Sequence, residues 1–168
     1  LNINSVNPGY TGQFILGSRL GMLGFYFDYS DVSGNGTGNY VSFKFATGNA
    51  LQYAKVQSVF NPIVDGNYHQ VVATNDAYNK SIALYVDGIL QGSGKYPSPK
   101  SVCANPQSLG FGIGASSLGN VGTPANYTER NTPIIIRNMG FWKGTCLSSG
   151  QARYLYNTGA FRTLAQLS

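Results

Sequence analysis

Charged residues are scarce in this chain, and carboxylates are the scarcest of them. Six Asp and Glu stand against eleven Lys and Arg in 168 residues, and Glu129 is the only glutamate. The net charge of +5 is spread without any run of Lys or Arg, whereas nucleic-acid binding usually needs a concentrated basic stripe. We therefore expect no nucleic acid among the partners.

Long apolar runs are also missing. No stretch of about 18 apolar residues could span a bilayer, so we expect no membrane insertion. The first residues lack the basic and apolar regions of a signal peptide, and the chain begins with Leu1 instead of Met. The length is that of one domain, so we expect residues 1–168 to form a single domain that belongs to a larger protein.

Cysteine is rare and not arranged for metal or redox chemistry. Cys103 and Cys146 are the only two, far apart and without a Cys-x-x-Cys spacing, so neither a zinc site nor a redox motif is indicated. One disulfide between them and two separate small buried thiols remain as alternatives.

Glycine and tyrosine are abundant instead, and apolar residues alternate with polar or small ones. The 22 glycines and 12 tyrosines accompany period-two stretches at residues 25–29, 40–46 and 109–115, the pattern of half-buried strands. Residues 81–86 alternate in the same way and run into Asp87-Gly88, a strong hairpin signal.

Helical signals occur only near the end of the chain. Ser148 or Ser149 can cap a helix over residues 150–157, and Gly159 can close it. Many short strands with one helix predict an all-β fold: an antiparallel two-sheet β-sandwich of the jelly-roll type with one short C-terminal helix.

Two stretches resemble a known family. Residues 65–76 read Asp-Gly-Asn-Tyr-His-Gln-Val-Val-Ala-Thr-Asn-Asp, and residues 81–88 follow with Ser-Ile-Ala-Leu-Tyr-Val-Asp-Gly. Residues 134–142 end in Gly-Phe-Trp, and Leu-Tyr-Asn follows at 155–157. Together they resemble the central strand pair, last strand and short helix of laminin-G-like and pentraxin-like domains, in the concanavalin A-like lectin and glucanase superfamily. The resemblance covers about a third of the chain and implies a concanavalin A-like jelly roll.

The chain departs from the family pattern at two places. Tyr68 stands where the family usually has Trp, and the strand that normally opens the domain is not evident before Asn7. We therefore expect the edges of the sandwich to be remodelled.

Catalysis is not expected. Glycanases of this fold need two carboxylates around the scissile bond, but the aspartates here fall in different strands and turns and the one glutamate is isolated. His69 is the only histidine, and the resemblance places it near the core, so we expect a hydrogen-bonded structural role and no catalytic triad.

Calcium is the one cofactor that the resemblance implies, at a site on the rim of the sandwich. Oxygen ligands for such a site could come from Asp28, Asn75 and Asp76. Ordinary turn chemistry is the alternative explanation for each of them.

Aromatic side chains in polar surroundings are the candidate ligand contacts. Tyrosines among small polar residues have the composition of adaptable binding loops, although the same tyrosines could instead cover sheet faces. The candidates are Tyr26, Tyr40, Tyr78, Tyr96 and Tyr127, together with Asn126. Trp142 could stack on a sugar, but its place in the Gly-Phe-Trp stretch predicts a core position.

The sequence thus predicts a non-catalytic recognition module that binds a glycan or glycoprotein in adhesion or receptor attachment. Its expected location is extracellular, at a cell surface or at a virion surface. The alternative is an assembly domain of a capsid, tail or fibre that contacts protein through its sheet faces; sulfated polysaccharide bound through the positive charge is a third option. Three Asn-x-Ser/Thr sequons, at Asn35, Asn79 and Asn126, would matter only in a eukaryotic secretory pathway.

Overall fold

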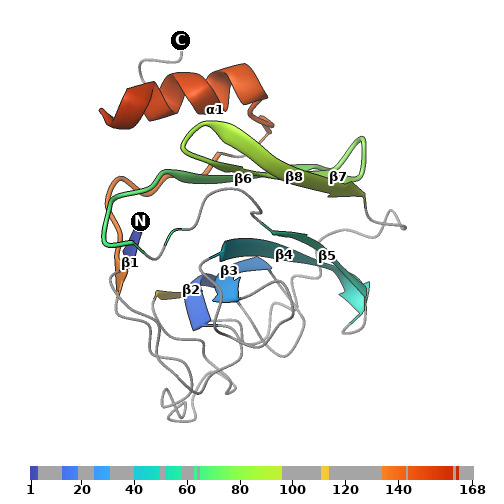
Figure 1. Cartoon of the computed structure of the whole chain (residues 1–168). Helices are drawn as coiled ribbons and strands as arrows, with labels where there is room; N and C mark the ends of the chain where they lie inside the picture. Colours follow the sequence, from blue (N-terminus) through green and yellow to red (C-terminus); the bar gives the residue numbers. More distant parts are fainter. Residues whose placement is uncertain are drawn as a thin grey trace.

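Two antiparallel sheets packed face to face form the body of the molecule in a computed structural model, with a helix on the outer side of the smaller sheet (Figure 1). The structure describes residues 1–3, 13–18, 25–30, 40–49, 52–57, 63, 65–95, 111–113, 134–142, 144–160 and 162. The predicted two-sheet sandwich with one short C-terminal helix is confirmed.

The larger sheet has five strands in the order β5-β4-β3-β2-β9. Its strands are β2 (Gln13–Ser18), β3 (Phe25–Ser30), β4 (Tyr40–Asn49), β5 (Gln52–Gln57) and β9 (Phe111–Ile113). Chain neighbours β2 to β5 pair in sequence, while β9 returns from far along the chain to pair with β2. The strands expected at residues 25–29, 40–46 and 109–115 therefore all belong to this sheet.

The smaller sheet is a meander of β6 (Val71–Asp76), β7 (Ser81–Val86) and β8 (Ile89–Lys95). Asp87 and Gly88 connect β7 to β8 with φ of 52° and 73°, the positive angles that a two-residue turn needs to match the twist of its strands. The Asp-Gly hairpin is confirmed.

Two short strands close one edge of the sandwich. β1 (Asn2–Ile3) pairs with β10 (Ile134–Ile135), and Asn2 also bridges Tyr68. The opening strand, which was not evident in the sequence, therefore exists but is only two residues long.

The main core lies between the two sheets. Alternate residues of β7, Ile82, Leu84 and Val86, point into it, because successive side chains of a strand point to opposite faces. Buried residues of the other sheet meet them there, namely Ile15, Val41, Phe43 and Val56.

The opposite face of the small sheet packs against α1 (Ser149–Tyr156). Val72 and Tyr85 of the sheet form a second buried cluster with Ala152 and Leu155 of the helix. Ser148 caps α1 and exchanges hydrogen bonds with Gln151 in a capping box. Asn157, with φ of 44°, ends the helix, so the predicted closure at Gly159 is two residues late.

None of the helices in the described part of the chain has the length and apolar character needed to cross a membrane.

Candidate functional site

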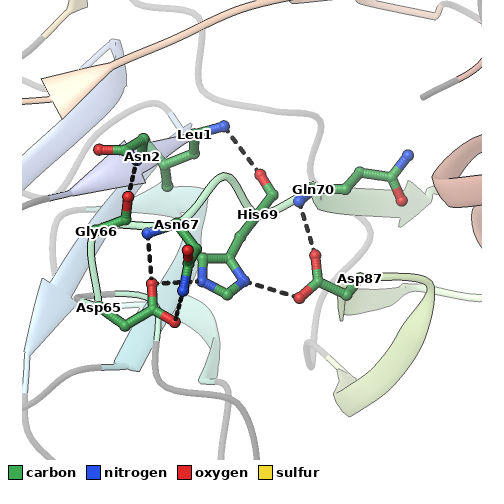
Figure 2. Close-up of polar contacts among 8 residues, drawn as sticks. All are labelled: Leu1, Asn2, Asp65, Gly66, Asn67, His69, Gln70 and Asp87. Atoms are coloured by element: carbon green, nitrogen blue, oxygen red, sulfur yellow. Dashed lines mark hydrogen bonds and ion pairs between the residues drawn. The ribbon is translucent and has the colours of Figure 1, made fainter. Parts of the chain in front are cut away.

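His69 lies between two carboxylates at the end of the sandwich where the β7–β8 hairpin turns (Figure 2). Its Nδ1 is 2.8 Å from Oδ2 of Asp87, and its Nε2 is 2.9 Å from Oδ1 of Asp65. Only 12% of the His69 side chain is exposed. We refer to Asp65, His69 and Asp87 as the histidine bridge.

The geometry of the histidine bridge favours the protonated imidazole. Both ring nitrogens face carboxylate oxygens, which accept hydrogen bonds, and neutral histidine has only one N–H to donate. The hydrogen bond to Asp87, and after it that to Asp65, raises the pKa of His69 above its usual 6.5 although burial opposes the shift. Hydrogen bonds from Asn67 and His69 lower the pKa of Asp65 to about 2.

The backbone around the bridge joins three separate parts of the chain. The Leu1 nitrogen donates to the His69 carbonyl at 2.9 Å, and the His69 N–H donates to the Leu1 carbonyl at 2.7 Å. The Gln70 N–H donates to Oδ1 of Asp87 at 2.9 Å. The bridge and these backbone bonds connect the N-terminal residues, the entry to β6 and the β7–β8 hairpin, and the hydrogen bonding predicted for His69 is present.

The side chain of Gln70 extends this network to the helix. When its amide oxygen and nitrogen are assigned to satisfy both neighbours, it donates to the Ala152 carbonyl at 3.2 Å and accepts from the Tyr156 N–H at 3.1 Å.

Asp76, one of the predicted calcium ligands, is engaged within its own turn. Its Oδ1 accepts from the Asn79 N–H at 2.9 Å and its Oδ2 from the Asn79 side chain at 2.7 Å, and these bonds lower the pKa of Asp76. Both oxygens of Asp76 thus accept a hydrogen bond from Asn79, as expected of ordinary turn chemistry.

The other predicted ligands are not gathered around Asp76. Asn75 precedes it on β6 and has its own interactions, while Asp28 belongs to β3 of the other sheet. Among the described residues, no group of three or more His, Cys, Asp or Glu could hold a metal ion. Calcium binding therefore stays a prediction.

The predicted tyrosine contacts fall at separate places. Tyr78 lies in the β6–β7 turn with 93% of its surface exposed. Tyr26 on β3 and Tyr40 on β4 belong to the five-stranded sheet. Tyr96, Asn126 and Tyr127 lie outside the described residues. Tyr78 thus has the exposure that a contact residue needs, and its turn belongs to the other sheet from Tyr26 and Tyr40.

An exposed apolar segment follows β10, and the sequence analysis missed it. Met139, Phe141 and Trp142 are 47%, 60% and 37% exposed. We call residues 139–142 the aromatic segment. The predicted core position of Trp142 is wrong, because Trp142 is 37% exposed. Its ring lies against Gly140, where an added Cβ would come within 3.1 Å of the ring.

The exposure of the aromatic segment has a local cause. Ile134 and Ile136 pack on the core, but Asn138 adopts a positive φ of 53° and breaks the strand alternation behind them. Just before this bend, the Arg137 guanidinium lies over the Tyr68 ring at 4.5 Å. Asn138, Gly140 and Gly144 around the aromatic residues are typical of turns, and this was the available sequence signal.

Cys146 is exposed, lies between the aromatic segment and α1, and has no disulfide partner among the described residues. Burial raises the pKa of the neighbouring Tyr85 phenol, and Cys146 adds to that shift. Cys103 lies outside the described residues, so the pairing of the two cysteines stays a prediction.

This architecture is similar to that of known proteins. A family model described as the concanavalin A-like lectin/glucanases superfamily, of the laminin G type, matches residues 2–131. No curated protein matches the chain. A crystal structure of an S-layer domain-containing protein from Clostridium thermocellum is similar at 13% identity with a TM-score of 0.42. That likeness covers 90% of this chain and 66% of the other, just under two thirds of its length.

Proposed function

We propose that this chain, which belongs to the concanavalin A-like lectin/glucanase superfamily, is a non-catalytic module that binds carbohydrate. The fold of this superfamily indicates a binding module. We further propose that its ligand is a glycan at a cell or virion surface.

The exposure of the aromatic segment is the observation that carries the proposal. Burial of Phe and Trp side chains stabilises a folded domain. Adjacent exposed aromatic rings on one segment therefore indicate a contact surface. Aromatic faces suit the apolar side of a sugar ring, while Trp can also donate a hydrogen bond from its indole nitrogen. Phe141 and Trp142 provide such rings.

The hydrogen-bond partners of the described carboxylates support a non-catalytic role. A glycoside hydrolase leaves space between its two carboxyl groups for the sugar and, in inverting enzymes, for a water. In the histidine bridge, the imidazole fills the space between Asp65 and Asp87. Asp76 is likewise held by Asn79.

A glycan-array screen of the chain produced in bacteria tests the proposal, run once with calcium and once with a chelator. Selective binding is expected, with dissociation constants on the order of micromolar to millimolar. Loss of the signal in chelator would support the predicted calcium site. An array without any hit would contradict carbohydrate binding and favour the alternative, an assembly module that contacts protein.

Three variants then locate the contact. Trp142→Ala and Phe141→Ala should each weaken binding roughly 3- to 10-fold, the worth of one lost aromatic contact. Gly140→Ala should also weaken it, because the added methyl would displace the Trp142 ring without straining a positive φ.

Tyr154→Ala is the matched control. Tyr154 is an exposed aromatic residue on α1, 43% exposed and stacked with Arg162, so its loss should leave the affinity unchanged. Tyr78→Ala examines the predicted turn contact separately. If binding survives both Phe141→Ala and Trp142→Ala at full strength, the aromatic segment is not the site.

A further inference from the structure

The β6–β7 turn carries a sequence motif that carbohydrate binding does not use. Asn79, Lys80 and Ser81 form the Asn-x-Ser acceptor sequence for N-linked glycosylation. The turn is fully at the surface, since Ala77, Tyr78 and Asn79 are exposed and Ser81 already begins β7.

The side chain of Asn79 is presented in a defined way. Its Nδ2 donates to Oδ2 of Asp76 at 2.7 Å, and its backbone N–H donates to Oδ1 at 2.9 Å. This uses one of the two hydrogens on Nδ2, and the other has no acceptor among the residues that the structure describes. A sugar on Nδ2 would replace that second hydrogen and could keep the bond to Asp76.

The fold also tolerates a large substituent at this position. No core side chain belongs to the turn, whose residues 77–79 are exposed, and Lys80 takes the positive φ of 51° that brings the chain back into β7. The turn lies at the opposite end of the small sheet from the β7–β8 hairpin, where Gly88 contacts the helix (Figure 1).

We propose that Asn79 is an N-glycan acceptor. The donor class is an oligosaccharide linked to a polyprenyl diphosphate. In the transfer, the bond between the anomeric carbon and the diphosphate oxygen breaks and a bond from that carbon to Nδ2 forms. Nδ2 loses one proton, and the polyprenyl diphosphate is the leaving group. This modification is independent of whether the chain itself binds glycans.

The test is secretion of the chain from cultured eukaryotic cells behind an added signal peptide, followed by peptide mapping with and without peptide-N-glycosidase. Most secreted molecules should carry a glycan on the peptide that contains Asn79, and the enzyme should remove it and leave Asp there. An unmodified Asn79 peptide in the secreted protein overturns the proposal, whatever the occupancy of Asn35 and Asn126.

Two variants distinguish loss of the sequon from an effect on folding. Ser81→Ala keeps Asn79 and its hydrogen bonds to Asp76 but destroys the sequon, so the glycan should be lost. Lys80→Asn keeps the sequon and suits the positive φ, so the glycan should remain. Should a variant not be secreted, translation into isolated microsomes gives the same readout as a gel shift, and no shift with the parent chain counts against the proposal.

Discussion

At the scale of single residues, His69 combines contacts to distant parts of the chain with a dependence on pH. Its pKa is raised in the folded state, so the stabilisation it provides is complete below its usual 6.5 and is lost as the pH rises through the folded value. The pKa of Asp65 is lowered from 3.8 to about 2, so its contribution is complete above 3.8 and is lost as the pH falls toward 2. The bridge is therefore strongest between these limits.

His69→Gln should lower the free energy of unfolding by about 2 kcal/mol near pH 5, because one charged donor to two carboxylates is lost. Urea unfolding of the variant and of the parent chain, near pH 5 and near pH 9, measures this loss of free energy. The difference from the parent chain should shrink at the higher pH, where His69 loses its proton. A difference that is the same at both values would contradict a charged bridge.

At the scale of elements, the β7–β8 hairpin and α1 meet at one glycine. A Cβ on Gly88 would lie 2.8 Å from the Arg153 Cα, which is backbone and cannot simply rotate away. Gly88 also has a positive φ of 73°, which costs other residues about 1 kcal/mol. The conformation of the hairpin turn and the packing of α1 thus both depend on Gly88.

Gly88→Ala should destabilise the protein by roughly 1–3 kcal/mol more than Gly144→Ala. Gly144 has a comparable φ of 82°, but nothing lies within 4 Å of its added Cβ, so it reports the backbone cost alone. Denaturant unfolding of both variants gives the comparison, and amide exchange in α1 should rise only in Gly88→Ala. Equal losses would mean that the close approach to Arg153 has no energetic weight.

Local sequence signals predicted the elements well, and contacts between elements less well. Asp87-Gly88 and the cap at Ser148 could be predicted because turns and caps depend on neighbouring residues. The partners of His69 could not, since Asp87 reaches it only through the register of β6 with β7. Trp142 was misplaced because its position in the Gly-Phe-Trp stretch predicted a core location, and the bend at Asn138 was not foreseen.

At the scale of the whole molecule, one strand holds the layers together. β7 sends Ile82, Leu84 and Val86 into the core between the sheets and Tyr85 toward α1. It is also the central strand of its sheet. Truncation of the side chains on its inner face should therefore destabilise the whole molecule.

Leu84→Ala should cost about 2–5 kcal/mol, the usual range for truncation of a buried leucine. Leu84 is 0% exposed, whereas Leu90 on the next strand is 45% exposed, so Leu90→Ala should cost less than about 1 kcal/mol. Thermal unfolding followed by both tryptophan fluorescence and far-ultraviolet circular dichroism measures the loss. Comparable effects of the two substitutions would be inconsistent with this core.

The histidine bridge also has a mechanical meaning. Leu1 is paired with His69 through two backbone hydrogen bonds, the His69 ring is bonded to the hairpin at Asp87, and Gln70 reaches α1. A force applied at Leu1 would therefore act on the small sheet through these two backbone hydrogen bonds, and on the core between the sheets through the neighbouring Ile3. The first three residues of the chain thus connect the small sheet to the core that it shares with the five-stranded sheet.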